Sequence, residues 1–246
     1  KNTSIMYKDI KINIVDTPGH ADFGGEVERV LNMVDGVVLL VDAFEGPMPQ
    51  TKYVLRKALE QKLKPIVVIN KIDRPDQRVE DVYDEVLELF MELGADDDQL
   101  DFPVIYATAR EGIAKYEMAD DNDNLEPLME IPAPRGDADG PLQMMVTTLD
   151  ADDYVGRVAI GRIIRGSVKT NQNVVLINGD QETKAKIGKV FVYQGLKRVE
   201  VPSAGLGEIV ALTGLGDVSI GYTVADAENP EALPTISIDE TTLSMT

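Results

Sequence analysis

The sequence of 246 residues predicts an α/β domain over residues 1–131, followed by an antiparallel β-barrel over residues 141–228. In the first part, apolar strands alternate with amphipathic helices, which is the spacing of a parallel sheet with helices on both faces. A stretch rich in proline and glycine over residues 132–140 then indicates a linker. After it, short β-rich runs are separated by glycines and show no helical period, which favours an antiparallel barrel.

The elements of the first domain follow from its apolar periodicity. Two strand-like runs, Lys1–Tyr7 and Ile10–Val15, indicate a hairpin. Helices are expected where apolar residues recur three or four positions apart, at 27–34, 54–59 and 79–93, and Gly94 is placed to end the last of them. Strands that are apolar on both faces are expected at 37–41, 65–69 and 104–106.

The second domain is predicted from six shorter runs. They occupy residues 142–149, 155–164, 174–177, 184–193, 208–212 and 222–224. Asn178-Gly179 is a strong hairpin signal between two of them. Residues 229–246 are expected to form a further linker and the start of a third domain, with Thr235–Leu243 as a first strand that the chain does not finish.

Composition and charge exclude several classes of function. The chain has no cysteine, which excludes disulfides, a thiolate metal site and a cysteine nucleophile, and permits a reducing cytoplasm. Its apolar runs are too short to span a bilayer, so we expect a cytoplasmic protein with no membrane partner. The net charge is −19, and residues 96–140 hold 13 acidic but only 3 basic residues, which indicates solvated loops. Such an acidic total argues against DNA binding, whereas the nearly neutral residues 141–228 leave room for local RNA contact.

The first loop of chemical interest is Asp16-Thr17-Pro18-Gly19-His20, which follows the apolar strand Ile10–Val15. It offers a carboxylate, a backbone N–H without side-chain bulk at Gly19, and the imidazole of His20, the one histidine of the sequence. These groups suit a Mg²⁺-bound phosphate and an attacking water. Asp and Gly are also common in ordinary turns, so the motif by itself leaves a plain strand-to-helix turn open.

A second loop, Asn70-Lys71-Ile72-Asp73, follows another apolar strand and suits the reading of guanine. The carboxylate of Asp73 can accept hydrogen bonds from the ring N1–H and the exocyclic amino group of guanine, which adenine does not offer. Lys71 can lay its methylene stem along the base plane, and Asn70 can tie neighbouring loops together. Thr108-Ala109 lies after a third buried strand and adds to the pattern. Taken alone, Lys71 and Asp73 could equally be solvated turn residues.

The two loops resemble the third and fourth conserved elements of translational GTPases. Two longer strings, residues 21–30 (ADFGGEVERV) and 41–51 (VDAFEGPMPQT), are similar more narrowly to the TypA/BipA branch, and elongation factor G and LepA differ from it just after the histidine. Residues 156–162 (GRVAIGR) and 235–240 (TISIDE) extend the likeness, which covers essentially the whole chain.

The resemblance implies an incomplete P-loop-type GTPase domain, followed by a barrel of the translation-factor second-domain type. It implies GTP binding and hydrolysis stimulated by the ribosome. Asp16 would hold Mg²⁺ through water, the Gly19 N–H would bind the γ-phosphate, and His20 would orient the attacking water.

The family also implies how the base is held and which partners the protein has. Asn70, Lys71 and Asp73 would bind guanine, with Thr108 and the backbone N–H of Ala109 adding to the base contact. The implied partners are GTP or GDP and the ribosome, through its RNA and proteins, and the protein is expected to be a monomer that acts in translation or ribosome assembly.

Two departures from the family pattern limit these expectations. No G-x-x-x-x-G-K-[ST] string occurs in the chain, so the phosphate cradle is missing. In the family, the strand that carries this cradle pairs between the strand ending at Val15 and the strand at 37–41. We therefore interpret the chain as a piece of a longer protein that is inactive alone. The family helix before the linker is also longer than residues 125–130 allow.

Two alternatives stay open at this point. The chain could act as a non-catalytic module whose barrel docks on ribosomal RNA or protein through its bases, which are Arg157, Arg162, Arg165, Lys184, Lys186 and Lys189. Alternating bases on barrel strands are, however, typical of a solvated face. The chain could also belong to another GTPase branch, such as elongation factor G, with the same chemistry and a different task.

Overall fold

The computed structural model describes residues 2–17, 24–129, 136–152 and 156–234. Its chain divides into two compact units. One, here called the α/β unit, contains the described residues 34–129, and the other, the barrel unit, contains the described residues 2–17, 24–33 and those from 136 onward. Within the described residues, every helix is too short or too polar to cross a membrane.

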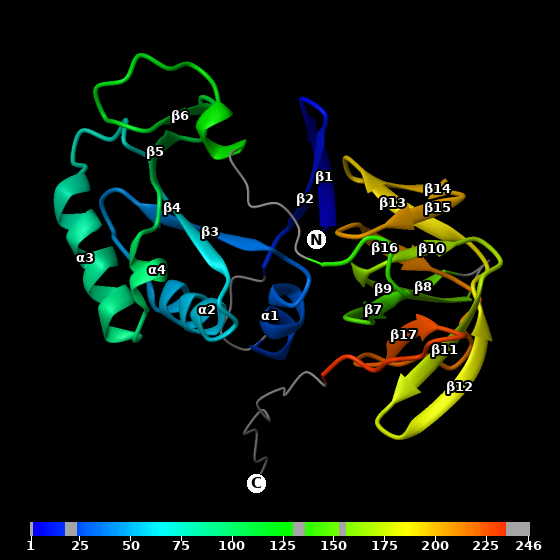
Figure 1. Ribbon diagram of the computed structural model, residues 1–246. Coiled ribbons are helices and arrows are strands. Elements are labelled where there is room, and N and C mark those ends of the chain that lie inside the picture. Colours follow the sequence, from blue (N-terminus) through cyan, green and yellow to red (C-terminus); the bar gives the residue numbers. More distant parts are fainter. Residues whose placement is uncertain (1, 18–23, 130–135, 153–155, 235–246) are drawn as a thin grey trace, which may run out of the picture. The chain divides into compact units, whose positions relative to one another are not determined.

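The α/β unit is built on a four-stranded sheet in the order β3-β4-β5-β6 (Figure 1). Its elements are β3 (Gly36–Asp42), α2 (Pro49–Glu60), β4 (Lys64–Asn70), α3 (Val79–Glu92), α4 (Asp97–Leu100), β5 (Val104–Thr108), β6 (Ile113–Lys115) and a 3₁₀ helix (Glu126–Met129). Strands β3, β4 and β5 run parallel, and β6 returns antiparallel to β5. The predicted parallel sheet is thereby confirmed.

Helices α2 and α3 cover one face of this sheet (Figure 1). Alternate residues of β3 and β4 point toward them, because side chains in a strand change face at every residue. The shared core is formed by Leu39, Val41, Val67 and Ile69 from the sheet and by Leu55, Leu59, Val82, Val86 and Phe90 from the helices. The expected apolar stripes of both helices are therefore the ones that are buried, although Tyr83 of the predicted stripe is 36% exposed.

Local signals explain where these helices begin and end. Pro49 is the first residue of α2, where its missing N–H costs no helical hydrogen bond. Helix α3 ends as predicted at Gly94, which has φ +75°. There the N–H of Ala95 donates to the carbonyl of Phe90 and the N–H of Gly94 to that of Met91, the pattern of a Schellman motif.

The opposite face of the sheet is covered over β4 and β5. Ile66, Val68 and Ile105 pack there against Leu125 and Leu128, next to the 3₁₀ helix. Over β3 the same face is open within the described residues, since Val38 and Leu40 are 57% and 58% exposed. The prediction of helices on both faces thus holds for the centre of the sheet, with a short 3₁₀ helix in place of a long one.

Two short elements of this unit were not predicted. The acidic run at residues 96–98 was expected to be loop, but residues 97–100 form α4. Asp96 caps this helix, because its carboxylate accepts from the Gln99 N–H at 2.9 Å while the Gln99 amide oxygen accepts from the Asp96 N–H at 3.1 Å. Strand β6 is only three residues long, which is too short to show a clear hydrophobic periodicity.

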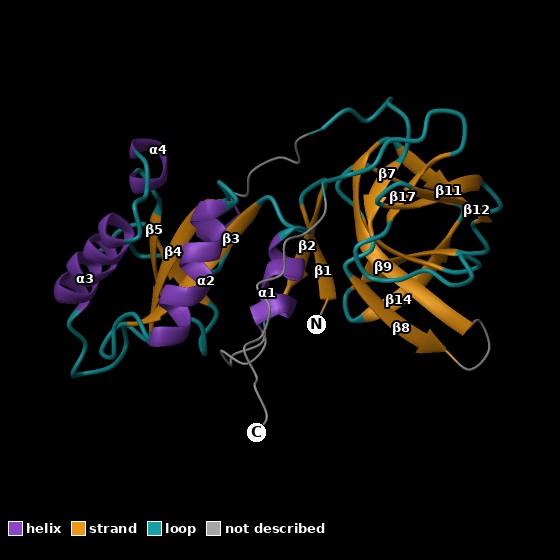
Figure 2. Cartoon of the chain, turned by 90° about the horizontal axis from the view of Figure 1, so that it is seen from below, coloured by secondary structure: helices purple, strands orange, loops and turns teal. Residues whose placement is uncertain are grey.

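The barrel unit is built on a curved antiparallel sheet, as Figure 2 shows. This sheet encloses a large apolar core. Its strand order is β12-β11-β17-β7-β9-β16-β13-β14, with β8 paired to β9, and β10 and β15 form a separate pair. The strands are β7 (Gln143–Met145), β8 (Thr148–Asp152), β9 (Gly156–Arg165), β10 (Ser167–Lys169), β11 (Asn173–Asn178), β12 (Gln181–Lys186), β13 (Val190–Gln194), β14 (Lys197–Val201), β15 (Ser203–Gly205), β16 (Ile209–Leu212) and β17 (Thr223–Asp226). The predicted antiparallel barrel is confirmed.

Individual barrel strands depart from the prediction. The run at 184–193 is not one strand, because residues 187–189 turn between β12 and β13, with Gly188 close to Thr213. The hairpin signal at Asn178-Gly179 is confirmed, since β11 and β12 pair with Asn178 opposite Gln181 and Gly179 has φ +58°. Strands β10, β14 and β15 were missed because they are short or rich in polar residues.

The N-terminal elements lie with the barrel. Strands β1 (Asn2–Tyr7) and β2 (Ile10–Val15) form the predicted hairpin, and α1 spans Gly24–Leu31. Val15, Val30 and Met33 pack on the outer face of the barrel, against Val158, Ile160, Tyr193, Ile209 and Ala211. Lys11 also pairs with Glu208 at 2.7 Å. From the sequence these elements belong to the first domain, whereas their buried apolar contacts here are with the barrel strands.

Two further expectations fall outside the described residues. They are the first part of the linker predicted over 132–140, of which residues 132–135 are not described, and the strand expected at Thr235–Leu243.

Candidate functional site

Three loops meet at the carboxyl edge of the sheet in the α/β unit. They follow β3, β4 and β5, whose last residues lie in register, with Asp42 opposite Asn70 and Asn70 opposite Ala107. Ligands of open α/β sheets bind outside the carboxyl ends of the strands, so this edge is the natural place for a site. The loops bring together Asn70, Lys71, Asp73, Thr108 and Ala109, all of which were singled out from the sequence.

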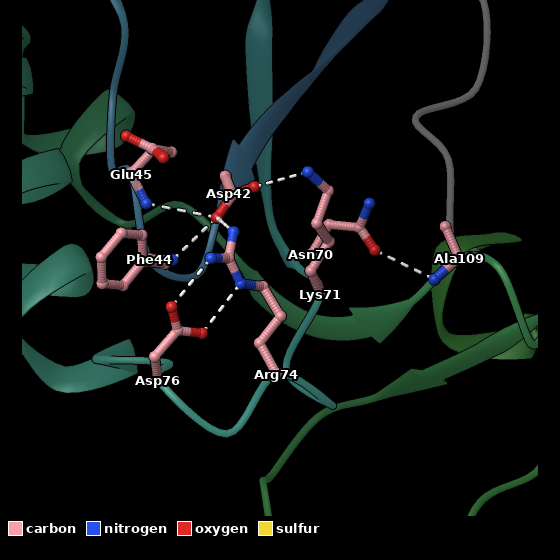
Figure 3. A network of polar contacts seen from close by, with 8 residues as sticks. All are labelled: Asp42, Phe44, Glu45, Asn70, Lys71, Arg74, Asp76 and Ala109. Atoms are coloured by element: carbon pink, nitrogen blue, oxygen red, sulfur yellow. Dashed lines mark hydrogen bonds and ion pairs between the residues drawn. The ribbon is translucent and has the colours of Figure 1, made fainter.

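Asn70 links the loops after β4 and β5. Its side-chain oxygen accepts a hydrogen bond from the Ala109 N–H at 2.9 Å (Figure 3). Its backbone oxygen accepts one from the Ala43 N–H at 2.8 Å. Thr108 is buried at the end of β5, and its carbonyl accepts from the Glu111 N–H at 3.0 Å. This turn leaves Ala109 exposed at the edge of the site.

Lys71 is held by a carboxylate from the neighbouring loop. Its backbone has φ +67°, a left-handed conformation that residues other than glycine seldom adopt. Its Nζ pairs with Oδ2 of Asp42 at 2.6 Å, although the lysine side chain is 56% exposed. The lysine therefore has a defined direction at a surface where it would otherwise be free to move.

Asp42 is the most strongly perturbed carboxylate at this edge. Partial burial raises its pKa, but hydrogen bonds from Lys71 and from the N–H groups of Phe44 and Glu45, together with the lysine charge, outweigh burial and lower the pKa to about 2. Its Oδ1 accepts from Phe44 N–H at 2.8 Å and from Glu45 N–H at 3.2 Å. The group is thus an anion at neutral pH that fixes both its own loop and Lys71.

Arg74, the residue after Asp73, also contacts Asp42 and so belongs to the same network of polar contacts. Its guanidinium donates to both oxygens of Asp76 at 2.9 Å, which lowers the pKa of that carboxyl group. It also lies 3.6 Å from Asp42 and over the ring of Phe44, 4.7 Å from the centroid. Figure 3 shows the guanidinium between the two carboxylates. The residue that follows Asp73 is therefore anchored on three sides.

Asp73 itself is exposed, and its carboxylate makes no hydrogen bond or ion pair within the part of the chain that the structure describes. Its neighbours Lys71 and Arg74 are both engaged by Asp42. A carboxylate left unpaired beside two anchored bases can accept two hydrogen bonds from a ligand. This is the chemistry expected of a group that reads a purine edge.

Of the other predicted loop, the structure describes Asp16 and Thr17, which belong to the barrel unit. Asp16 follows β2 and is exposed. Gly19 and His20 fall outside the described residues. Across the described ranges, no group of three or more His, Asp or Glu side chains gathers as a metal site would require. A single carboxylate such as that of Asp16 suits Mg²⁺, an ion that keeps several waters and takes one or two carboxylates besides phosphate oxygens.

Sequence reasoning missed three residues of this edge, namely Asp42, Phe44 and Arg74. One signal was present, because Asp42 ends an apolar strand as Asn70 does. Its pairing with Lys71 depends on the register of β3 and β4, which cannot be read from either segment alone.

The bases named earlier on the barrel are largely engaged within the chain. Arg165 pairs with Glu231 at 2.8 Å, and Lys189 pairs with Glu200 at 2.8 Å. Arg157 donates to the carbonyl of Val218 at 3.0 Å. Lys184 and Lys186 are exposed on β12. Most of this set therefore has a structural partner.

Comparison with known proteins identifies the family. The family described as the elongation factor Tu GTP binding domain matches residues 1–135, and elongation factor Tu domain 2 matches residues 156–225. Relatives named "Large ribosomal subunit assembly factor BipA" are 54% identical in Salmonella typhimurium, Bacillus subtilis and Synechocystis, over all of this chain. The chain spans about two fifths of their length (41%, 41% and 42%). By these matches and by the loops at the edge of its parallel sheet, the chain belongs to the translational GTPase family that shares the elongation factor Tu GTP-binding domain.

Proposed function

We propose that the natural protein is a ribosome-associated GTPase of the BipA type that acts in assembly of the large ribosomal subunit. The observation that carries this is the unpaired carboxylate of Asp73 at the carboxyl edge of the sheet, between two anchored bases. The names of the relatives, which cover the whole chain, support the ribosomal task.

In this proposal the α/β unit reads the base. The carboxylate of Asp73 accepts from N1–H and the exocyclic amino group of guanine, and the stem of Lys71 lies along the ring. Asn70 holds the Ala109 N–H in place by the bond of 2.9 Å, so that the loop with Thr108 and Ala109 borders the base. The preference for guanine follows because adenine has no N1–H and no amino group at that position.

The loop after β2 handles the phosphates. Asp16 would hold Mg²⁺ through water, the Gly19 N–H would bind the γ-phosphate and His20 would orient the attacking water. When bound, Mg²⁺ neutralises the negative charge that grows on the phosphate oxygens. Because the chain contains no G-x-x-x-x-G-K-[ST] cradle, we expect these 246 residues alone to bind GTP weakly and to hydrolyse almost none.

The wider organisation follows the family. We propose that residues 1–131 form a GTP-binding domain, 132–140 a linker and 141–228 the second domain, with residues 229–246 leading into a third. The partners are GTP or GDP and the ribosome, and we expect a cytoplasmic monomer. A non-catalytic RNA-binding role is less well supported, because Arg157, Arg165 and Lys189 are engaged within the chain.

The test is a switch of base specificity in the full-length natural protein. Asp73→Asn replaces one acceptor by a donor, so it should weaken GTP and strengthen XTP, in which the amino group is replaced by a carbonyl. Equilibrium competition against a fluorescent guanine nucleotide measures both affinities. Asp84→Asn makes the same chemical change on the exposed surface of α3 and is the matched control. Equal preference in the Asp73→Asn protein and the wild type would remove Asp73 from base reading.

Two further measurements test the remaining steps. His20→Ala should keep nucleotide binding and abolish hydrolysis stimulated by ribosomes, and unchanged turnover would rule out the proposed role of His20. Ribosome sedimentation with and without GTP separates the two functions, since a GTPase factor should need the nucleotide and a passive RNA-binding module should not.

A further inference from the structure

We propose that Asp42 is a positioning residue for guanine recognition, which it serves by holding Lys71 in its binding direction before the nucleotide arrives. This inference rests on the proposed function, because it concerns the same site. It adds a residue from the loop after β3 to a recognition loop that follows β4.

The two carboxylate oxygens of Asp42 make contacts with different loops. Oδ1 accepts from the N–H groups of Phe44 and Glu45 at 2.8 and 3.2 Å, and so fixes the turn to which Asp42 belongs. Oδ2 accepts from Nζ of Lys71 at 2.6 Å and so reaches across to the next loop. The side chain of Asp42 is only 15% exposed and that of Lys71 is 56% exposed, so a largely buried carboxylate holds an ammonium group at the surface.

The turn that carries Asp42 is a firm support. The N–H of Gly46 donates to the carbonyl of Asp42 at 3.0 Å, and Gly46 has φ +75°. This left-handed backbone favours glycine, and a Cβ at Gly46 would lie 2.2 Å from a carboxylate oxygen of Glu85, whose side chain would have to move. Arg78 ties the turn to the start of α3, since its N–H donates to Ala43 at 2.9 Å and its Nε to the carbonyl of Phe44 at 2.6 Å.

The Asp42 pair lowers the conformational entropy that Lys71 would otherwise lose on binding the nucleotide. A lysine side chain loses about 2 kcal/mol of rotamer entropy when it is fixed in one conformation. Because the Asp42 pair fixes the ammonium group in the free protein, part of this loss occurs on folding and not on binding. The methylene stem then spans a fixed interval in the free protein, from the Lys71 backbone to the ammonium group at Asp42.

The alternative is that Asp42 matters only for the turn. Two substitutions separate these roles. Asp42→Asn keeps an oxygen that accepts from Phe44 and Glu45 but loses the charge that holds Lys71. Asp42→Glu keeps the charge and can still reach Lys71, but its longer side chain disturbs the turn.

The experiment measures the Kd for a fluorescent GDP analogue in the full-length natural protein. Asp42→Asn should raise the Kd about threefold to fivefold, the ratio that one partly exposed ion pair supplies. Asp42→Glu should restore part of the affinity. In a Lys71→Met background, Asp42→Asn should have no further effect, because the group through which Asp42 acts is gone. Glu92→Gln, which removes the exposed ion pair with Lys52 at 2.8 Å on the helices, is the matched control and should leave the Kd unchanged.

The outcomes distinguish the two proposals. A wild-type protein that binds no guanine nucleotide overturns the proposed function and this inference together. A wild type that binds while Asp42→Asn has an equal or lower Kd overturns the inference alone. An effect of Asp42→Asn that persists in the Lys71→Met background would assign Asp42 to the turn and also overturn it.

Discussion

Asp42 gives a quantitative prediction for the acid stability of the α/β unit. Its pKa is about 2 in the folded chain against an ordinary value of 3.8. A carboxyl group whose pKa is lower when folded stabilises the fold above its unfolded pKa. That contribution is present at pH 7 and is lost as the pH falls through 3.8 toward 2. The Asp42→Asn protein lacks it at every pH.

The size of the effect follows from the same shift. A difference of nearly two units corresponds to at most about 2.5 kcal/mol of folding free energy. Because the Lys71 side chain is 56% exposed, solvent screens the pair, and we expect about 1 kcal/mol. At pH 3 the carboxyl group of Asp42 is mostly protonated in the unfolded chain but not in the folded one, so roughly half of this stabilisation should be lost by that pH.

Urea unfolding at pH 7, 5, 4 and 3, followed by ellipticity at 222 nm, measures this contribution. The signal reports chiefly on α2 and α3, the two longest helices of the described chain, which both belong to the α/β unit. The free energy of unfolding of the wild type should exceed that of Asp42→Asn by about 1 kcal/mol at pH 7 and by about half as much at pH 3. If the difference in free energy of unfolding between the two proteins stays constant or grows as the pH falls, the reasoning is refuted.

Three further substitutions test other contacts. Asn70→Ala removes the acceptor of the Ala109 N–H and should speed hydrogen exchange of that amide, seen by NMR, by roughly tenfold; an unchanged rate would mean that the bond does not form in solution. Gly161→Ala places a Cβ 1.9 Å from the carbonyl oxygen of Met145, so it should cost about 3 kcal/mol and lower the Tm, and an unaltered Tm would contradict this close approach. Phe90→Ala empties a fully buried site under α3 and should cost about 4 kcal/mol in urea unfolding; a loss below about 1 kcal/mol would argue against that core.

Sequence reasoning succeeded where short-range signals act. Helix α3 was predicted from its apolar period and from Gly94, and both the buried face and the left-handed residue are found. The hairpin over residues 2–15 and the one at Gly179 are likewise specified by a few adjacent residues. Strands β14 and β15 were missed, because a short polar strand is defined by its partners and carries little pattern of its own.

The sequence by itself determined the parallel α/β arrangement, the barrel that follows and the residues of the candidate loop after β4, because periodicity, turn residues and strand-end positions are local properties. Tertiary structure alone decided that Asp42 holds Lys71 and that Arg74 lies between two carboxylates. Asp42 and Lys71 are 29 residues apart in the chain, and they meet because the parallel register of β3 and β4 places Asp42 opposite Asn70. Such a contact depends on how two distant segments align, and neither segment specifies that alignment alone.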